Sequence, residues 1–590
     1  GGIMQQLNLP KCHIDSYPRP QMVRKSFINL NGEWDFAFDY ENVGDKEKWY
    51  KKTSFDKKII VPYVYQTKAS GINEQKPCEN VWYLKKLSYS KKSGKRLILN
   101  FEGADYITKV YVNGELVGTH RGAYTRFSFD ITNFLKAENI IVVKCEDSYD
   151  RFQPRGKQRC ADENYGCWYT DTTGIWKTVW AEEVSFSYVK TLTSSSSFCE
   201  DAVIFEYEVA NITEDLSIEI SASFKGQKIA SVEKKIVQKI DKLTLNLLNT
   251  KDWWGVQWWI HHSPNLFDVD VVLKKNGKAI DEIGSYTAIV RYASKGQEIL
   301  VNTEPVYFRM VLDQGYFPDS DLTPKSDEEI IQDIRLMKEM GFNGVRKHQK
   351  IEDERFYYYC DVMGLYAWCE MPSPYEFRDE EVERVTDEWL EIVRQYKSHP
   401  SIMTWVCFNE SWGIMHVLDD KKQQAFTLSA YYLVKALDQT KFVISNDGWE
   451  HTKSDIITIH DYASCGSEIV RKYGNIEERC ANSVSQSRSN RQIFANGYHY
   501  EGQPVILSEY AGIAFSGGEK EAWGYGDRVT TVEQYLKRYE DTTDGIYACK
   551  SISGFCVTQL TDVMQEINGL LTIDRKPKLP IEELKRIHSK

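Results

Sequence analysis

Two glutamates of this chain each follow a strongly apolar run, a placement that suits chemistry better than packing. Glu410 comes two residues after the run 402–408, and Glu509 comes two residues after the run 505–507. Burying an ionised carboxylate without partners is costly, so a glutamate at the edge of a core is seldom accidental. Two carboxylates about 5–5.5 Å apart can cleave a glycosidic bond with retention, one as nucleophile and the other as acid/base. Capping or ion pairing is the alternative for either glutamate taken alone.

Eight short apolar runs, most of them separated by helical or irregular stretches, predict the elements that hold these glutamates. The runs are 307–312, 344–346, 366–369, 402–408, 442–445, 456–459, 505–507 and 554–557. Helical patterns at 327–340 and 380–396 lie between some of them. Such alternation favours a parallel sheet covered on both faces, and we expect residues 299–590 to form a catalytic (β/α)8 TIM barrel.

The residues that follow these strands are rich in groups that bind hydroxyls or move protons. In a TIM barrel this end of the strands holds the active site. The candidates for substrate binding are Arg346, Lys347, His348, Asn409, Trp449, His460, Tyr462, Gln559 and Asn568. Strands four and seven lie on opposite sides of such a barrel. Glu410 and Glu509 are therefore expected to face each other across the hollow at the carboxyl ends of the strands, which we call the cup. Proximity of two carboxylates separates their pKa values, which would keep one of them protonated as the acid.

The part of the chain before residue 299 predicts two β-sandwiches. Residues 1–183 contain several strand patterns, with Asn113-Gly114 marking a hairpin, and favour a jelly roll. Residues 184–298 show short strands at regular spacing, which is typical of an immunoglobulin-like sandwich. The chain has 590 residues, more than the roughly 250–300 that one hydrophobic core can serve, so three units are reasonable.

Composition narrows the functional class. A formal net charge of −11 argues against a nucleic-acid binder. The 13 cysteines show neither a CxxC pair nor metal-ligand spacing, which predicts reduced thiols, a cytoplasmic location and no metal site. No apolar run is long enough to span a membrane, and no phosphate-binding loop or other cofactor motif stands out. The aromatic content of 13% is compatible with a homo-oligomer.

Several motifs resemble glycoside hydrolase family 2, the β-galactosidase and β-glucuronidase family. They are Asn409-Glu410 after its apolar run, ILSEY at 506–510, NGEWDF at 31–36, DTTGIW at 171–176, GFNGVR at 341–346 and DRKPK at 574–578. The resemblance implies that Glu410 is the acid/base, that Glu509 is the nucleophile and that Asn409 binds the sugar 2-hydroxyl. It also implies that Tyr462 orients the nucleophile and that Arg346 lies beside it, keeping it ionised.

Two departures from the family pattern concern the substrate. Family β-glucuronidases resemble one another in an asparagine-any-lysine motif, which grips the sugar carboxylate just before a glycine. The corresponding stretch 566–569 reads Glu-Ile-Asn-Gly, so the lysine is missing and Glu566 would oppose a uronate unless it turns away. The family tryptophan after the last barrel strand is also replaced, by TQLTD at 558–562. Lys347 and Lys350 could meet a carboxylate by another route, with a solvated charge as the alternative.

These patterns predict an exo-acting retaining β-glycosidase whose partner is a carbohydrate or glycoside. β-Galactosidase is the first substrate hypothesis, and β-hexuronidase, acting on glucuronides or galacturonides, is the alternative. A carbohydrate-binding protein that has lost activity is the non-enzyme alternative, because a fold alone does not establish an activity. The presence of both glutamates together with Asn409 argues against that reading.

Overall fold

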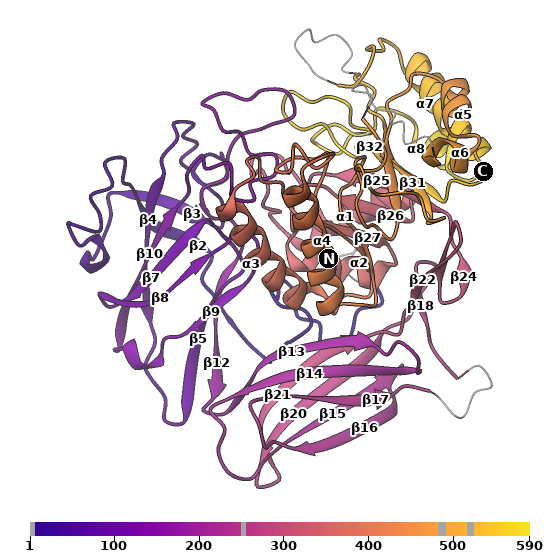
Figure 1. Cartoon of the computed structure of the whole chain (residues 1–590). Helices are drawn as coiled ribbons and strands as arrows, with labels where there is room; N and C mark the ends of the chain where they lie inside the picture. The colour runs from indigo at the N-terminus through magenta and orange to yellow at the C-terminus, as the bar shows by residue number, and fades with distance from the viewer. Residues whose placement is uncertain (1–5, 249–254, 482–490, 516–523) are drawn as a thin grey trace.

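The computed structural model describes residues 6–248, 255–481, 491–515 and 524–590, which form two β-sandwiches and a barrel (Figure 1). In Figure 1 the first sandwich lies at the left, the second lies at the bottom, and the barrel lies above it and extends to the right. This arrangement confirms the predicted fold class, while the domain limits at residues 183 and 298 stay a prediction. Among the described residues, no helix is both long and apolar enough to cross a membrane.

The first sandwich is a jelly roll built from a four-stranded and a six-stranded sheet, in the orders β1-β12-β5-β9 and β3-β2-β4-β10-β7-β8. The strands are β1 Ile28–Asn29, β2 Gly32–Phe38, β3 Lys57–Val61, β4 Asn80–Ser88, β5 Lys95–Phe101, β7 Ile107–Val112, β8 Glu115–Arg121, β9 Phe127–Asp130, β10 Glu138–Glu146 and β12 Val179–Ser185. β6 Ala104–Asp105 pairs with β11 Gly174–Ile175, and two short 3-10 helices are η2 Trp49–Lys51 and η3 Thr132–Phe134. The predicted hairpin is confirmed, because Asn113 and Gly114 have φ of 52° and 81° between β7 and β8.

The second sandwich packs a three-stranded sheet, β13-β14-β17, against a four-stranded sheet, β16-β15-β20-β21. Its strands are β13 Tyr188–Ser196, β14 Ala202–Ala210, β15 Leu216–Phe224, β16 Gln227–Lys235, β17 Ile240–Asn246, β20 Phe267–Lys275 and β21 Lys278–Thr287. Alternate residues of β20, namely Phe267, Val269, Val271 and Leu273, are buried, as one face of a sandwich strand requires. Short strands lead to the barrel: β18 Trp259–Ile260, β19 Ser263–Pro264, β22 Tyr292–Lys295, β23 Glu298–Val301 and β24 Glu304–Pro305.

The third unit contains one parallel sheet of eight strands, in the order β29-β28-β27-β26-β25-β32-β31-β30. They are β25 Phe308–Asp313, β26 Gly344–Lys347, β27 Tyr366–Glu370, β28 Ile402–Val406, β29 Phe442–Ile444, β30 Ile457–His460, β31 Val505–Ala511 and β32 Gly554–Thr558. All eight predicted strands are therefore confirmed. The outermost strands β29 and β30 approach each other where the Asp455 amide donates to the Val443 carbonyl at 2.9 Å, which nearly closes the barrel.

Helices cover the outside of this sheet (Figure 1). They are α1 Asp327–Glu339, α2 Glu354–Met363, α3 Asp379–Tyr396, α4 Lys421–Leu437, α5 Gly466–Tyr473, α6 Ile476–Ala481, α7 Val532–Ala548 and α8 Ile581–Ile587. The two predicted helical patterns are confirmed as α1 and α3. Helix α1 starts at Ser326, whose hydroxyl accepts the Glu329 amide, a standard N-terminal cap. Helix α3 buries Val385, Trp389 and Ile392 at the spacing of one helical face.

A long connection of the jelly roll, residues 147–173 between β10 and β11, lies against the barrel. The amides of Arg155 and Gly156 both donate to the Ser373 carbonyl at 3.1 Å. Gly156 has φ of 65°, and a Cβ there would lie 2.5 Å from the Gln349 carbonyl oxygen, so the contact requires glycine. The jelly roll thus supplies part of the wall around the carboxyl ends of the barrel strands.

Candidate active site

Glu410 projects from a tight turn that follows β28. Glu410 and Ser411 have φ of 53° and 60°, a left-handed conformation that residues other than glycine adopt at some cost in energy. The turn is held by the Glu410 amide, which donates to the Asp447 carbonyl at 2.9 Å. Such strain persists where the surrounding structure enforces it, and here it directs the carboxylate into the cup.

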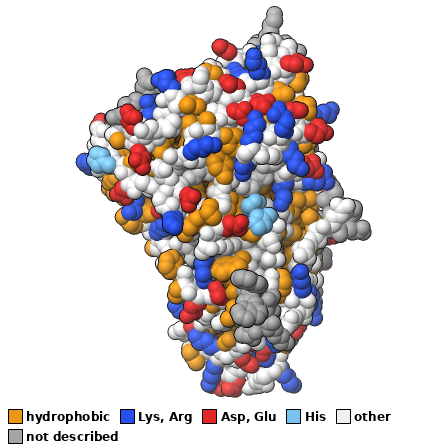
Figure 2. Space-filling view, turned by 90° about the vertical axis from the view of Figure 1, so that its right-hand side faces the viewer, with side chains coloured by type: hydrophobic (Ala, Val, Ile, Leu, Met, Phe, Trp, Pro, Cys, Tyr) orange, Lys and Arg blue, Asp and Glu red, His pale blue; other side chains and the backbone are white. Residues whose placement is uncertain are grey.

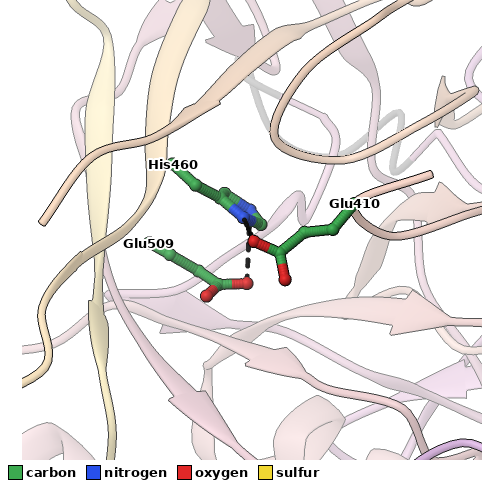
Figure 3. A group of neighbouring side chains, drawn as sticks. All are labelled: Glu410, His460 and Glu509. Carbon is green, nitrogen blue, oxygen red and sulfur yellow. Dashed lines mark hydrogen bonds and ion pairs between the residues drawn. The ribbon is translucent and has the colours of Figure 1, made fainter. Parts of the chain in front are cut away.

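Glu410 and Glu509 face each other with His460 between them, as Figure 3 shows. The His460 Nδ1 atom lies 2.9 Å from Glu410 Oε2, and its Nε2 atom lies 3.2 Å from Glu509 Oε2. The three ligand-type atoms, including one oxygen of each glutamate, lie within 4.8 Å of one another. This separation fits the close pair of a retaining glycosidase and is shorter than the roughly 6.5–9.5 Å of inverting enzymes.

The two carboxylates differ in depth. The Glu410 side chain is 16% exposed, whereas that of Glu509 is 3% exposed. A group that exchanges protons with a leaving group and with water needs access to solvent, while a nucleophile does not. The difference matches the roles that the resemblance implies for each glutamate.

Arg346 organises the floor of the cup from a fully buried position at β26. Its NH1 atom pairs with Glu509 Oε2 at 2.8 Å, and its Nε atom pairs with Glu370 Oε2 at 2.7 Å. The Tyr462 hydroxyl donates to the other oxygen of Glu509, so both oxygens of that carboxylate are held. These partners hold the carboxylate in one orientation, which a nucleophile requires.

Asn409 presents a free hydrogen-bond donor to the cup. Its Oδ1 atom accepts from Arg346 NH2 at 2.7 Å, which fixes the orientation of the amide. Its Nδ2 atom is buried and has no hydrogen-bond partner among the residues that the structure describes. A buried donor without a partner usually awaits a water or a ligand, so the geometry fits the predicted contact with a sugar hydroxyl.

Asn409→Ala is expected to lower kcat/KM about 100-fold on a nitrophenyl β-glycoside, because a contact that strengthens in the transition state is lost. The matched control is the 2-deoxy form of the same glycoside, which lacks the predicted acceptor. On that substrate the variant and the wild type should differ by less than about threefold. Equal losses on both substrates would show that Asn409 acts by another route.

Opposite charges define the electrostatics of the cup. Burial lowers the pKa of His460, but the carboxylates of Glu509 and Glu410 outweigh burial and raise it to about 10. Burial raises the pKa of Glu410, but the His460 charge outweighs this and holds the value below its ordinary range. The expectation of a protonated acid beside a second carboxylate is therefore corrected for the unliganded cup. His460 and Glu410 together hold one proton, which can pass between them across 2.9 Å.

The same three side chains could surround a cation, yet their protonation opposes it. The His460 Nε2 atom also lies 2.8 Å from Asp447 Oδ1, so both ring nitrogens point at carboxylates. An imidazolium ring has no free lone pair to give to a metal. The chemistry of this donor set favours proton transfer over metal coordination.

Four of the other candidates lie in the walls of the cup. The His348 Nδ1 atom is 2.8 Å from Glu370 Oε1, where burial is the main cause of the raised Glu370 pKa of about 7. Trp449 packs edge-on against His460 with ring centroids 5.8 Å apart. Gln559 donates to Asn568 Oδ1 at 2.8 Å. Direct contact of His348, Trp449, Gln559 and Asn568 with a sugar stays a prediction.

Lys347 does not reach the cup, which corrects its prediction as a substrate-binding residue. Side chains alternate along a strand, so Arg346 points into the barrel and Lys347 points outward toward the helices. The Lys347 ammonium pairs with Asp313 Oδ2 at 2.7 Å and with Glu352 Oε2 at 2.9 Å. Lys350 is also buried and pairs with Glu352 at 2.7 Å, so neither lysine is a solvated charge.

The jelly-roll connection contributes wall residues that the sequence reading missed. The Tyr169 hydroxyl donates to Glu566, which also accepts from Gln314 Nε2 at 3.2 Å and Asn568 Nδ2 at 3.1 Å. Three neutral donors thus hold the Glu566 carboxylate in place. Lys157 lies in the same connection. The sequence offered one indication that this connection has such a role: 147–173 is a long stretch without strand pattern inside a β domain.

Comparisons with known proteins agree with this architecture. Residues 27–179 match the sugar binding domain of the glycosyl hydrolases family 2, and residues 293–590 match its TIM barrel domain. The chain is 27% identical over 413 residues to a β-galactosidase of Thermoanaerobacter pseudethanolicus, covering 66% of this chain and 52% of that protein. It is 22% identical over 559 residues to human β-glucuronidase, covering 85% of this chain and 80% of that protein.

The fold also matches solved structures. A β-glucuronidase from Ruminococcus gnavus in complex with D-glucuronic acid superposes with a TM-score of 0.77 at 18% identity, covering 99% of this chain and all of that one. The chain spans about half the length of the first curated relatives it matches, 52% and 50%. The barrel match alone takes in half of the sequence, and the jelly-roll match adds most of the first sandwich. The chain therefore belongs to glycoside hydrolase family 2.

Proposed function

We propose that the protein is a retaining exo-β-glycosidase, with Glu509 as the nucleophile and Glu410 as the acid/base. The observation that carries this proposal is the close approach of the two carboxylates, within 4.8 Å through one oxygen of each. Such a close approach is typical of the carboxylate pair of a retaining enzyme, whereas inverting enzymes hold the pair farther apart to admit a water.

In the first step a Glu509 oxygen attacks the anomeric carbon and the bond to the leaving oxygen breaks. Glu410 gives that oxygen the proton which the His460–Glu410 pair holds, so the aglycone departs as a neutral alcohol. Arg346, at 2.8 Å from Glu509, keeps the attacking oxygen oriented. The product of this step is a glycosyl ester on Glu509.

In the second step a water molecule occupies the place of the aglycone. Glu410 takes a proton from it as the oxygen attacks the anomeric carbon, and the ester bond to Glu509 breaks. Glu509 returns as a carboxylate and the pair regains its proton. Two inversions at the same carbon give net retention.

The terminal sugar has two candidate classes. β-Galactosides are the first hypothesis from the sequence, and relatives of this chain include proteins named β-galactosidase and β-glucuronidase. One observation favours a hexuronide: Lys157 places a buried ammonium group beside the cup without an ion-pair partner among the described residues. A panel of nitrophenyl β-galactoside, β-glucoside, β-glucuronide and β-galacturonide separates the classes.

NMR of the first-formed sugar tests the mechanism. On the best substrate of the panel, the anomeric proton signal of the β product should appear first, and the α signal should grow only as mutarotation proceeds. An α product within the first turnovers would overturn the double-displacement assignment. Tight sugar binding without turnover on any of the four substrates would instead support the binding-protein alternative.

A further inference from the structure

Lys157 is a buried cation that the catalytic steps above do not use. It belongs to the jelly-roll connection 147–173 and is only 7% exposed. Its backbone is fixed on both sides, because its carbonyl accepts the Tyr169 amide at 2.8 Å and the Tyr375 hydroxyl donates to the carbonyl of Gly156. The ammonium group is therefore positioned by both the jelly roll and the barrel.

The ammonium group of Lys157 lacks the partner that a buried charge normally has. Its one hydrogen bond in the described structure goes to Cys167 Sγ at 3.3 Å, a weak acceptor. It also lies 5.5 Å from the ring centroid of Trp168, a contact that favours a cation. It forms no ion pair with any carboxylate of the described residues, although buried ammonium groups are usually paired.

Lys157 lies beside residues of the cup wall. A small cavity of about 10 Å³ is lined by Lys157 and Arg155 together with the wall residues Gln314 and His348. Burial raises the pKa of Glu566, and Lys157 opposes this more than any other charge. The pKa of Glu410 is lowered first by His460 and then by Lys157. Lys157 thus lies near both Glu410 and Glu566 without touching either.

Lys157 is close enough to Glu566 and Glu410 for their charges to act on it. Glu410 and Glu509 flank the anomeric carbon, and the Asn409 Nδ2 donor faces the hydroxyl next to it. Lys157 lies on another side of the cup, beside Glu566, whose carboxylate is already occupied by three donors. The donor capacity left on Lys157 is therefore available to a negatively charged group of the substrate.

We propose that Lys157 is a specificity-determining residue that binds an anionic substituent of the terminal sugar, with the carboxylate of a hexuronic acid as the first candidate. This rests on the proposed glycosidase function and deepens it by naming the substrate class. A sulfate ester on the sugar offers the same charge and is distinguished by experiment. A neutral hydroxyl would leave the charge of the buried ammonium group unpaired.

The test compares wild type with Lys157→Met, which keeps the volume and removes the charge, and with Lys157→Arg, which keeps the charge. Lys144→Met is the matched control, because Lys144 is another buried lysine of the jelly roll, paired with Asp45 at 2.6 Å. The readout is the ratio of kcat/KM on nitrophenyl β-glucuronide or β-galacturonide to kcat/KM on the β-galactoside. Thermal unfolding of each variant verifies that it folds.

Lys157→Met is expected to lower this ratio about 100-fold, with Lys157→Arg retaining more of it and Lys144→Met leaving it unchanged. If Lys157→Met lowers kcat/KM only on a 6-sulfated galactoside, the result would support the anion site and assign it to sulfate. A ratio that changes by less than about threefold, or a wild type that cleaves only neutral glycosides, would overturn the proposal.

Calorimetry with D-glucuronate gives a readout without turnover. Binding of D-glucuronate should be lost in Lys157→Met, and equal binding by the wild type and this variant would also overturn the proposal. If no β-glycoside is cleaved at all, the proposed function fails separately.

Discussion

Glu509→Ala is expected to lower kcat/KM on nitrophenyl β-glycosides by at least about 10⁴-fold, because the glycosyl ester can no longer form. Glu410, the other carboxylate of the proposed pair, is engaged with His460 at 2.9 Å and would act on the leaving group, so it does not replace Glu509. Steady-state kinetics on the best substrate of the panel measures the loss.

Azide provides the decisive control for Glu509→Ala. A small anion can enter the space left by the missing carboxylate and attack the anomeric carbon from that face. Turnover should be partly restored and should yield the α-glycosyl azide, which NMR identifies. Glu540→Ala is the matched variant, since Glu540 lies on helix α7 and pairs with Arg586 at 2.7 Å, and it should leave activity unchanged. Residual activity above about 10% of wild type in Glu509→Ala, or a β-glycosyl azide product, would contradict the assignment.

Glu410→Gln is expected to slow substrates according to their leaving groups. A dinitrophenyl glycoside needs no proton and should lose less than about tenfold in kcat/KM, whereas an alkyl glycoside should lose about 10³-fold. The second step also needs Glu410 as a base, so the variant should release a burst of dinitrophenol and then turn over slowly. A uniform loss across leaving groups would show that Glu410 is not the acid.

The pH profile offers a second check on Glu410. The neighbouring carboxylates raise the pKa of His460 to about 10, and the His460 charge lowers the pKa of Glu410. The pair therefore keeps its single proton through neutral pH and loses it as the pH rises toward the His460 value. For poor leaving groups kcat/KM should fall over that alkaline range in wild type. Glu410→Gln should lack this alkaline limb, and a limb of the same position in the variant would contradict proton donation by the pair.

Local patterns were sufficient to predict the elements that carry the chemistry. The eight apolar runs became the eight barrel strands, because a strand buried on both faces leaves a continuous apolar signature over four to eight residues. The polar groups after those runs marked the end of the barrel where side chains converge. Glu410, Glu509 and Asn409 were identifiable in this way, since each follows directly from its own strand.

The direction in which each strand side chain points could not be predicted from these local patterns. Arg346 and Lys347 are neighbours with similar charge, yet one lies in the cup and the other pairs with Asp313 behind it. The alternation of a strand separates them, but the phase of that alternation depends on how the strand sits in the barrel. A strand buried on both faces carries no polar periodicity from which the phase could be read.

The sequence was enough to predict the family and the three-part fold class, both confirmed, and to single out the two glutamates as candidates, because each rests on short-range patterns. The charge state of the cup and the composition of its walls depended on contacts between distant segments. Carboxylates on other strands raise the pKa of His460, and Glu566 is held by a tyrosine of another domain. Lys157, from a jelly-roll loop, lies beside the wall residues Gln314 and His348. No local pattern records which residues will come into contact across a domain boundary, because those contacts depend on how the folded domains pack.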